Sequence, residues 1–209
     1  MLIQGSVTVS DKMRLEMGKG QKDGIFADYF ANVSPDSYLH GKGQDVGFLL
    51  TGTLTTLSKG ADVNLKSQDA IIFNGDATLK GNSADLILQS ENWTYVDSTM
   101  GEKIGGDIEI YGGVKKKGQT IEDKQGANAD GTSVYIQGTT VLETQNKGTD
   151  IKIYASQESI INGDLVAGGS IGSSGVQFAG PGSNVLIKAF NKGIRMQGST
   201  NAAQDLTLK

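Results

Sequence analysis

The ionisable side chains of this chain do not gather into a catalytic motif. The single histidine, His40, has no partner histidine nearby, and the chain contains no cysteine. A Ser/His/Asp triad or a zinc site needs several such groups, so we interpret His40 as a loop residue. The two arginines, Arg14 and Arg195, lie near opposite ends of the sequence. Polysaccharide lyases and glycoside hydrolases need clustered carboxylates, or a base with arginine and often calcium. The sequence therefore predicts no enzyme activity and no cofactor.

Aspartates recur at intervals, each directly before an alternating apolar run. They are Asp62, Asp85, Asp107, Asp150 and Asp205. In stacked repeats they would form a column, in which like charges repel unless they are paired. They either bind a cation or accept backbone N–H hydrogen bonds at turns, and we favour the second interpretation. The segment 41–45 resembles one calcium-binding nonapeptide, but that motif works through several stacked copies. We therefore expect no metal-binding residue.

Three consecutive lysines and the single tryptophan are the candidate surface-contact residues. Lys115, Lys116 and Lys117 are followed closely by acidic residues, which is typical of a solvated loop, with polysaccharide or surface contact as the functional alternative. Their replacement by serine is expected to weaken attachment without changing the melting temperature. Trp93 either offers a ring for sugar stacking or packs partly buried against the fold.

A repeat of about 22 residues must position these side chains. The segment DVNLKSQDAIIFNGDATLKG (62–81) returns as DIKIYASQESIINGDLVAGG (150–169), a displacement of 88 residues that we divide into four steps. Similar openings lie at 85–88, 107–110, 133–136, 184–187 and 205–208. Short runs with period-2 alternation predict strands, and a period of this length is typical of solenoids.

The sequence thus predicts an all-β chain folded as a parallel β-helix, with three short strands per coil. Regular coils are expected over residues 61–209, with insertions near 112–131 and 168–183. Residues 1–60 are expected to be diverged coils or an inserted element. Val63 and Ile151 should point inward on one column, four coils apart. Outward positions such as Lys152 should tolerate substitution, and Asn74 and Asn162 should belong to a ladder of turn amides.

The charge and termini restrict the partners. A formal net charge of −4 and a pI near 5.0 argue against nucleic acid or an anionic membrane surface. No run reaches transmembrane length, and the start MLIQGSVTVS lacks signal-peptide features. We expect a piece of a longer protein, because the sequence stops within a repeat opening that has no polar cap.

The runs GTLTTLSKGADVNL (52–65) and GPGSNVLIKA (180–189), with the repeated Asn-Gly-Asp, carry a resemblance. Over about residues 50–209 the chain resembles the filamentous haemagglutinin class of bacterial surface adhesins, exported by two-partner secretion or related routes. This resemblance implies a right-handed parallel β-helix in a fibrous stalk, secreted or on the bacterial cell surface. It carries over no functional residues, because the class has no shared catalytic motif.

The expected function is therefore a non-catalytic rod segment of an adhesin. Its partner would be a host or cell-surface receptor, a glycan or a sister fibre. Two alternatives remain open. One is a polysaccharide lyase or glycoside hydrolase, and the other is a phage tailspike-like or self-assembling surface-layer β-helix.

Overall fold

Three parallel sheets make up most of the protein. The computed structural model describes residues 1–17, 46–97 and 102–209, and every regular element in these ranges is a β-strand. Sheet A consists of β1 (Leu2–Ile3), β4 (Val46–Leu50), β7 (Ala70–Phe73), β10 (Thr94–Val96), β15 (Thr132–Ile136), β18 (Glu158–Ile161) and β23 (Ile194–Met196). Sheet B consists of β2 (Ser6–Val9), β5 (Thr53–Thr56), β8 (Asp76–Leu79), β11 (Glu102–Ile104), β16 (Val141–Thr144), β19 (Asp164–Ala167) and β24 (Thr200–Ala202). Sheet C consists of β3 (Met13–Met17), β6 (Val63–Ser67), β9 (Leu86–Ser90), β12 (Ile108–Gly112), β17 (Ile151–Ala155), β22 (Val185–Ala189) and β25 (Leu206–Leu208).

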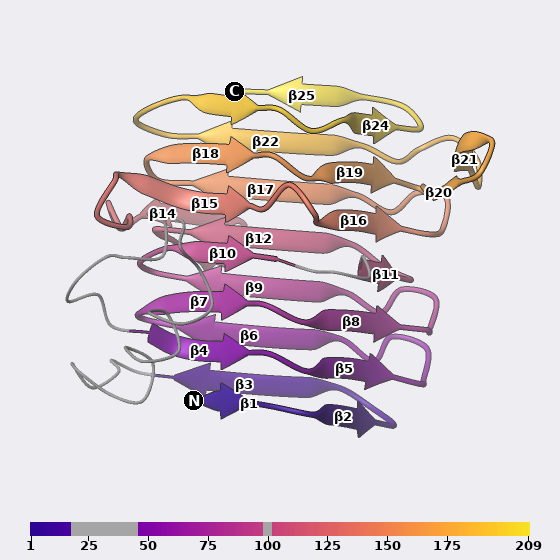
Figure 1. Cartoon of the computed structure of the whole chain (residues 1–209), viewed down its shortest axis with the longest axis horizontal. Helices are drawn as coiled ribbons and strands as arrows, with labels where there is room; N and C mark the ends of the chain where they lie inside the picture. Colours follow the sequence, from indigo (N-terminus) through magenta and orange to yellow (C-terminus); the bar gives the residue numbers. More distant parts are fainter. Residues whose placement is uncertain (18–45, 98–101) are drawn as a thin grey trace.

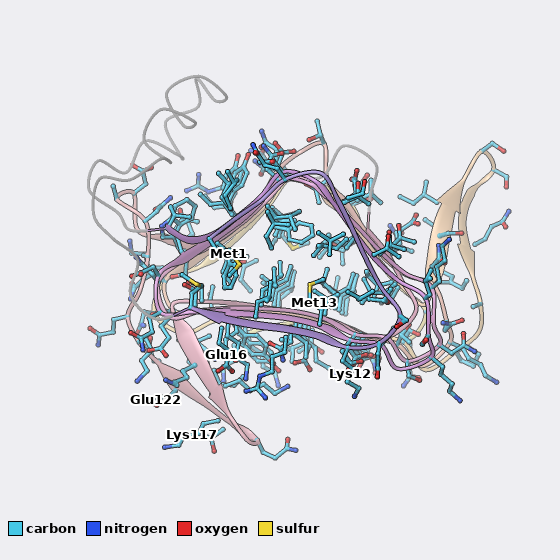
Figure 2. All side chains as sticks on the ribbon, turned by 90° about the horizontal axis from the view of Figure 1, so that it is seen from below. Met1, Lys12, Met13, Glu16, Lys117 and Glu122 are labelled. Carbon is cyan, nitrogen blue, oxygen red and sulfur yellow. The ribbon has the colours of Figure 1, made fainter. Side chains whose placement is uncertain are left out.

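The chain passes through sheets A, B and C in turn and then returns to sheet A, one strand further along. We call one such passage a coil, and we number the seven coils formed by the described residues from the N-terminus. Figure 1 shows the strands stacked in this order, and Figure 2 shows the three-sided outline with side chains packed inside. The predicted all-β class with parallel sheets is confirmed, and the arrangement is consistent with a β-solenoid.

The register in sheet C corrects the predicted number of coils between Val63 and Ile151. Val63 pairs with Leu86, Leu86 with Ile108, and Ile108 with Ile151. The two residues therefore share a column three coils apart, not four. The segment 133–136 belongs to β15 in sheet A and not to the sheet C column, a difference that arises because strands of all three sheets show the same alternation. The last step, from Ile108 to Ile151, spans 43 residues because it contains an extra hairpin.

The core lies between the three sheets, and it is formed by strands in which buried residues alternate with half-buried ones. Along β6 and β17 the residues at odd numbers are buried, and the two between them are half-buried. One cluster of buried side chains runs from β4 to β22. Because each strand contributes only two or three inward residues, no coil encloses a core by itself, and each depends on its neighbours.

The repeated Asn-Gly-Asp marks the turn from sheet A to sheet B. A Cβ at Gly75 would collide with the carbonyl oxygen of Gly52 in the preceding coil, so close approach requires glycine there. Asn74 and Asn162 occupy equivalent positions in coils 3 and 6. The two coils between them carry Asp97 and Gln137 at this position, so the column is not made of asparagine alone. Each of these four residues donates its backbone N–H to the preceding coil. The predicted amide ladder is therefore interrupted by a carboxylate.

In the part of the chain that the structure describes, two antiparallel hairpins leave the coils. β13 (Val114–Lys117) and β14 (Thr120–Asp123) lie between sheets C and A, and β20 (Gly169–Gly172) and β21 (Gly175–Phe178) lie between sheets B and C. Both fall within the ranges where insertions were expected. Residues 1–17 form coil 1, and β4 and β5 begin coil 2. The intervening residues 18–45 lie outside the described part, with His40 and the segment 41–45 among them.

Candidate functional site

Two of the three candidate lysines bind the hairpin β13–β14 to carboxylates of sheet C, one in strand β12 and one directly after strand β9. Nζ of Lys115 lies 2.6 Å from Oε1 of Glu91, and Nζ of Lys116 lies 2.5 Å from Oε2 of Glu109. Lys117 is exposed at the outer end of β13 and points away from the coils in Figure 2. The default interpretation of the three lysines as a solvated loop needs refinement, because Lys115 and Lys116 form ion pairs at the base of the hairpin, and surface contact stays a prediction.

Two stacked tyrosines support this base. The rings of Tyr111 in coil 4 and Tyr154 in coil 5 lie 5.1 Å apart with an interplanar angle of 4°. The Tyr111 hydroxyl donates a hydrogen bond of 2.8 Å to Glu109, and Nζ of Lys116 lies 5.6 Å from the Tyr111 ring centroid. Burial first, and then the charge of Glu109, raise the pKa of Tyr111 above its usual value. Tyr111 thus stays protonated and holds Glu109 in place for Lys116.

Between the hairpin and sheet C lies a groove of about 240 Å³. We call it the hairpin groove. Its polar lining includes Glu16, Lys66, Gln68, Gln89, Glu91 and Lys115. The hydrogen bond and charge of Glu91 raise the pKa of Lys115, and those of Arg14 lower the pKa of Glu16. Both groups are therefore charged at neutral pH. The groove presents N–H donors and carboxylate and amide acceptors together, which suits a ligand rich in hydroxyl groups.

The aspartates before the sheet C strands form a hydrogen-bonded column, which we call the aspartate ladder (Asp62, Asp85, Asp107 and Asp150). The N–H of Asp85 donates to Oδ1 of Asp62 at 3.2 Å, and the N–H of Asp107 donates to Oδ1 of Asp85 at 2.8 Å. Asp107 and Asp150 accept in the same way, at 2.9 Å each, from Asp150 and Asn184. The favoured role as N–H acceptors is confirmed, but the donor belongs to the next coil rather than to the same turn.

The ladder is unevenly neutralised. Lys12 pairs with Asp62 at 3.1 Å, and Lys152 lies 2.7 Å from Asp107 and 3.3 Å from Asp150. Burial acts to lower the pKa of Lys152, but the hydrogen bond and charge of Asp107, with Asp150, raise it above its usual value. Within the described ranges, Asp85 is the ladder member without a lysine in ion-pair contact.

Burial, and then the charges of its ladder neighbours Asp107 and Asp62, raise the pKa of Asp85, against the hydrogen bond from the Asp107 N–H. The carboxylates of the aspartate ladder also do not point toward a common centre. No group of three or more His, Asp or Glu side chains in residues 1–17, 46–97 and 102–209 is placed to hold a metal ion.

A recess of about 570 Å³ lies beside Asp85, at the turn from sheet B to sheet C. Coil 4 makes this turn with three residues, 105–107, whereas coils 3 and 5 use six, 80–85 and 145–150. Asn146 spans the gap, because its Nδ2 donates to the Gly105 carbonyl at 2.6 Å and lies 3.4 Å from Oδ1 of Asn82. The sequence interpretation missed this recess, although the adjacent glycines 105 and 106 are a signal for a short turn.

Trp93 does not lie at the surface. Its side chain is 3% exposed and belongs to a second hydrophobic cluster with Ile72, Tyr95 and Tyr135. Ile72 sits between Ile71 and Phe73, which face the main core, so this cluster lies on the outer side of sheet A. Of the two interpretations of Trp93, packing against the fold is therefore the one that holds, and the possible surface contact at Trp93 is corrected, since a buried ring offers no stacking face to a sugar.

Comparisons of the chain with protein-family models, curated proteins and solved structures found no match. Among the residues that the structure describes, no helix is long and apolar enough to cross a membrane.

Proposed function

We propose that this chain is a segment of a right-handed parallel β-helix that acts as a non-catalytic rod in a secreted or cell-surface filamentous adhesin. The partner we propose is a glycan on a host or cell-surface receptor. The hairpin groove is the observation that carries this proposal. It lies where an inserted element packs on the outside of a repeating stack.

The stack supports the rod role. The main hydrophobic cluster continues through coils 2 to 6, and residues of coils 1 and 7 pack against it while remaining half-buried. Since the strands of each coil pair with those of its neighbours along the stack, such an architecture can be lengthened by adding coils without changing its core. That property suits a stalk that holds a binding surface away from a cell.

The hairpin groove supports the choice of ligand. Glu16 and Lys66 come from neighbouring coils, 3.8 Å apart, and Lys115 comes from the hairpin. Sugar hydroxyls donate and accept hydrogen bonds, so they can satisfy carboxylate, ammonium and amide groups in one groove. Elements outside the repeating coil are also where binding residues are commonly carried.

The test is removal of the hairpin from an otherwise intact stack. Residues 113–131 are replaced by Ser-Gln, the pair that joins β17 to β18 at 156–157. Binding to a glycan array should be lost, while circular dichroism and cooperative unfolding are retained. The matched control replaces residues 168–184 by the six-residue turn 145–150, and it should keep binding.

Two results would overturn the proposal. One is glycan binding that survives removal of β13–β14. The other is release of products from uronic-acid polymers that is lost when one carboxylate is replaced, because this would indicate an enzyme.

A further inference from the structure

The hairpin β20–β21 has one strand edge that no other described strand pairs with. β20 and β21 form a small sheet of their own. β20 lies against the coils, where its Ile171 N–H donates to Oε1 of Glu143, in β16, at 2.7 Å. β21 lies on the other side of β20, outside the stack of coils in Figure 1. The coils therefore hold one edge of this sheet, and the edge of β21 is open. Open edges of this kind can add a strand from another chain.

The open edge of β21 presents the backbone of Val176 and Phe178. The N–H of Ala179 donates to the Gly168 carbonyl at 2.8 Å, so the two residues of this opposite pair are hydrogen-bonded. Bonded and non-bonded pairs alternate along an antiparallel ladder, and in this register Val176 and Phe178 belong to non-bonded pairs. Their N–H and C=O groups therefore point away from β20, toward the open side.

One face of the hairpin is apolar and uncovered. Ile171 and Val176 lie opposite each other, and Phe178 follows two residues after Val176, so the three side chains share a face. Ile171 is 42% exposed and Phe178 is 46% exposed. The residue opposite Phe178 is Gly169, which has no side chain to cover the ring. A strand added to β21 would extend this apolar face into a wider one.

The hairpin also lacks the charges that commonly keep a strand edge unpaired. Residues 165–187 contain no Asp, Glu, Lys, Arg or His, and no other stretch of the chain without these residues is as long. Exposed edges are often protected by charged side chains, lysine above all. Two copies of this uncharged segment can therefore meet without like charges coming together, although the whole chain carries a formal net charge of −4.

From these features we infer that β21 of one copy pairs antiparallel with β21 of a second copy, about a two-fold axis at Gln177. In this register Val176 of each copy lies opposite Phe178 of the other, so the outward N–H and C=O groups of both residues find partners. Apolar side chains meet on one face, and the two Gln177 side chains meet on the other. The contact is isologous and closes as a dimer. Since one short strand from each copy makes it, the interface is small and association is transient. The inference does not depend on the adhesin role.

The experiment traps the pair with a disulfide, because the chain contains no cysteine of its own. Gln177→Cys places one thiol from each copy at a non-bonded pair on the axis, with Cα atoms about 4.5 Å apart, a separation that a disulfide can span. Ser174→Cys is the matched control, at an exposed position in the turn of the same hairpin. Antiparallel pairing places its two copies about 20 Å apart along the strands. In a glutathione buffer Gln177→Cys should give at least about tenfold more disulfide-linked dimer than Ser174→Cys, because pairing raises the effective concentration of its two thiols.

Two further substitutions, made in the Gln177→Cys protein, test the apolar edge. Phe178→Lys puts a lysine beside Val176 of the other copy and should reduce the dimer to the level of Ser174→Cys. Leu57→Lys changes a leucine that is 54% exposed, in the turn from sheet B to sheet C of coil 2, and it should leave the dimer yield unchanged. Equal yields from Gln177→Cys and Ser174→Cys overturn the proposal and leave the edge of β21 to a strand of a different protein. A yield that Phe178→Lys does not lower also overturns it.

Discussion

The ammonium group of Lys152, in coil 5, lies 2.7 Å from Oδ2 of Asp107, in coil 4. A second carboxylate, that of Asp150, lies 3.3 Å away. One lysine on the outer face of sheet C therefore neutralises two members of the aspartate ladder in adjacent coils.

Replacing Lys152 by glutamine should lower the free energy of unfolding by about 1 kcal/mol, because it leaves two neighbouring carboxylates without their cation. Urea unfolding at neutral pH measures the effect. Lys147→Gln, at an exposed position in the turn before β17, is the matched control and should be silent. Lys152→Asp, expected from the sequence to be tolerated, should be worse than either. Equal stability of all three variants would contradict the role assigned to Lys152.

Asp85→Asn should raise the melting temperature at neutral pH. Since the pKa of Asp85 is raised in the folded protein, the folded state binds this proton more tightly than the unfolded state, and the charged form destabilises the fold above that pKa. The amide oxygen can still accept the N–H of Asp107, as Asn184 shows that the column tolerates an amide. The gain should shrink as the pH falls through the titration of Asp85.

Asp62→Asn is the control for this effect, because Asp62 is paired with Lys12 at 3.1 Å. It should bring no gain at neutral pH. Melting curves across a pH series separate the two variants, and a gain of equal size for both would count against the explanation from unpaired charge.

Ile153→Asp should abolish cooperative folding of the neighbouring coils, because Ile153 is fully buried in the main core and an unpaired charge there costs several kcal/mol. Ile87 is also an isoleucine of sheet C, but it lies between Leu86 and Leu88 and faces outward. Ile87→Asp should therefore be tolerated far better. Thermal unfolding followed by circular dichroism gives the comparison, and similar losses would show that the two faces are misassigned.

Gly75→Ala should destabilise the turn from sheet A to sheet B by about 1–3 kcal/mol, because the added methyl group meets the Gly52 carbonyl and a Leu50 methyl group. Gly193 has open space at the same atom, so Gly193→Ala should be nearly neutral. Chemical denaturation of both variants tests whether contact between coils, rather than glycine flexibility, is what matters at this turn.

Most of the predictions from the sequence rest on patterns of residues that are adjacent in the chain. The alternation of Val63 and Leu65 with polar residues predicts which side chains enter the core, because a strand places successive residues on opposite faces. The Asp62 column was likewise predicted to accept backbone N–H groups. What alternation does not specify is the sheet to which a strand belongs, and this is why residues 133–136 were placed in the wrong one.

The parts that sequence reasoning missed depend on contacts between distant segments. Glu109, Tyr111 and Lys116 come together because β13 folds back on the coil that precedes it. The recess beside Asp85 exists because coil 4 has fewer turn residues than its two neighbours. Trp93 is buried in the second hydrophobic cluster, which lies on the outer side of sheet A. None of these follows from the residues adjacent in the chain.

The three-sided cross-section has a mechanical consequence. Strands lie across the stack, so the hydrogen bonds between coils point along the axis on which the coils are stacked (Figure 1). Bending the stack in any direction must stretch at least one of the three sheets along that axis, and hydrogen bonds weaken steeply when they are lengthened. A single flat sheet would flex freely about its own plane. Three sheets arranged on three sides of a common interior resist bending in every direction.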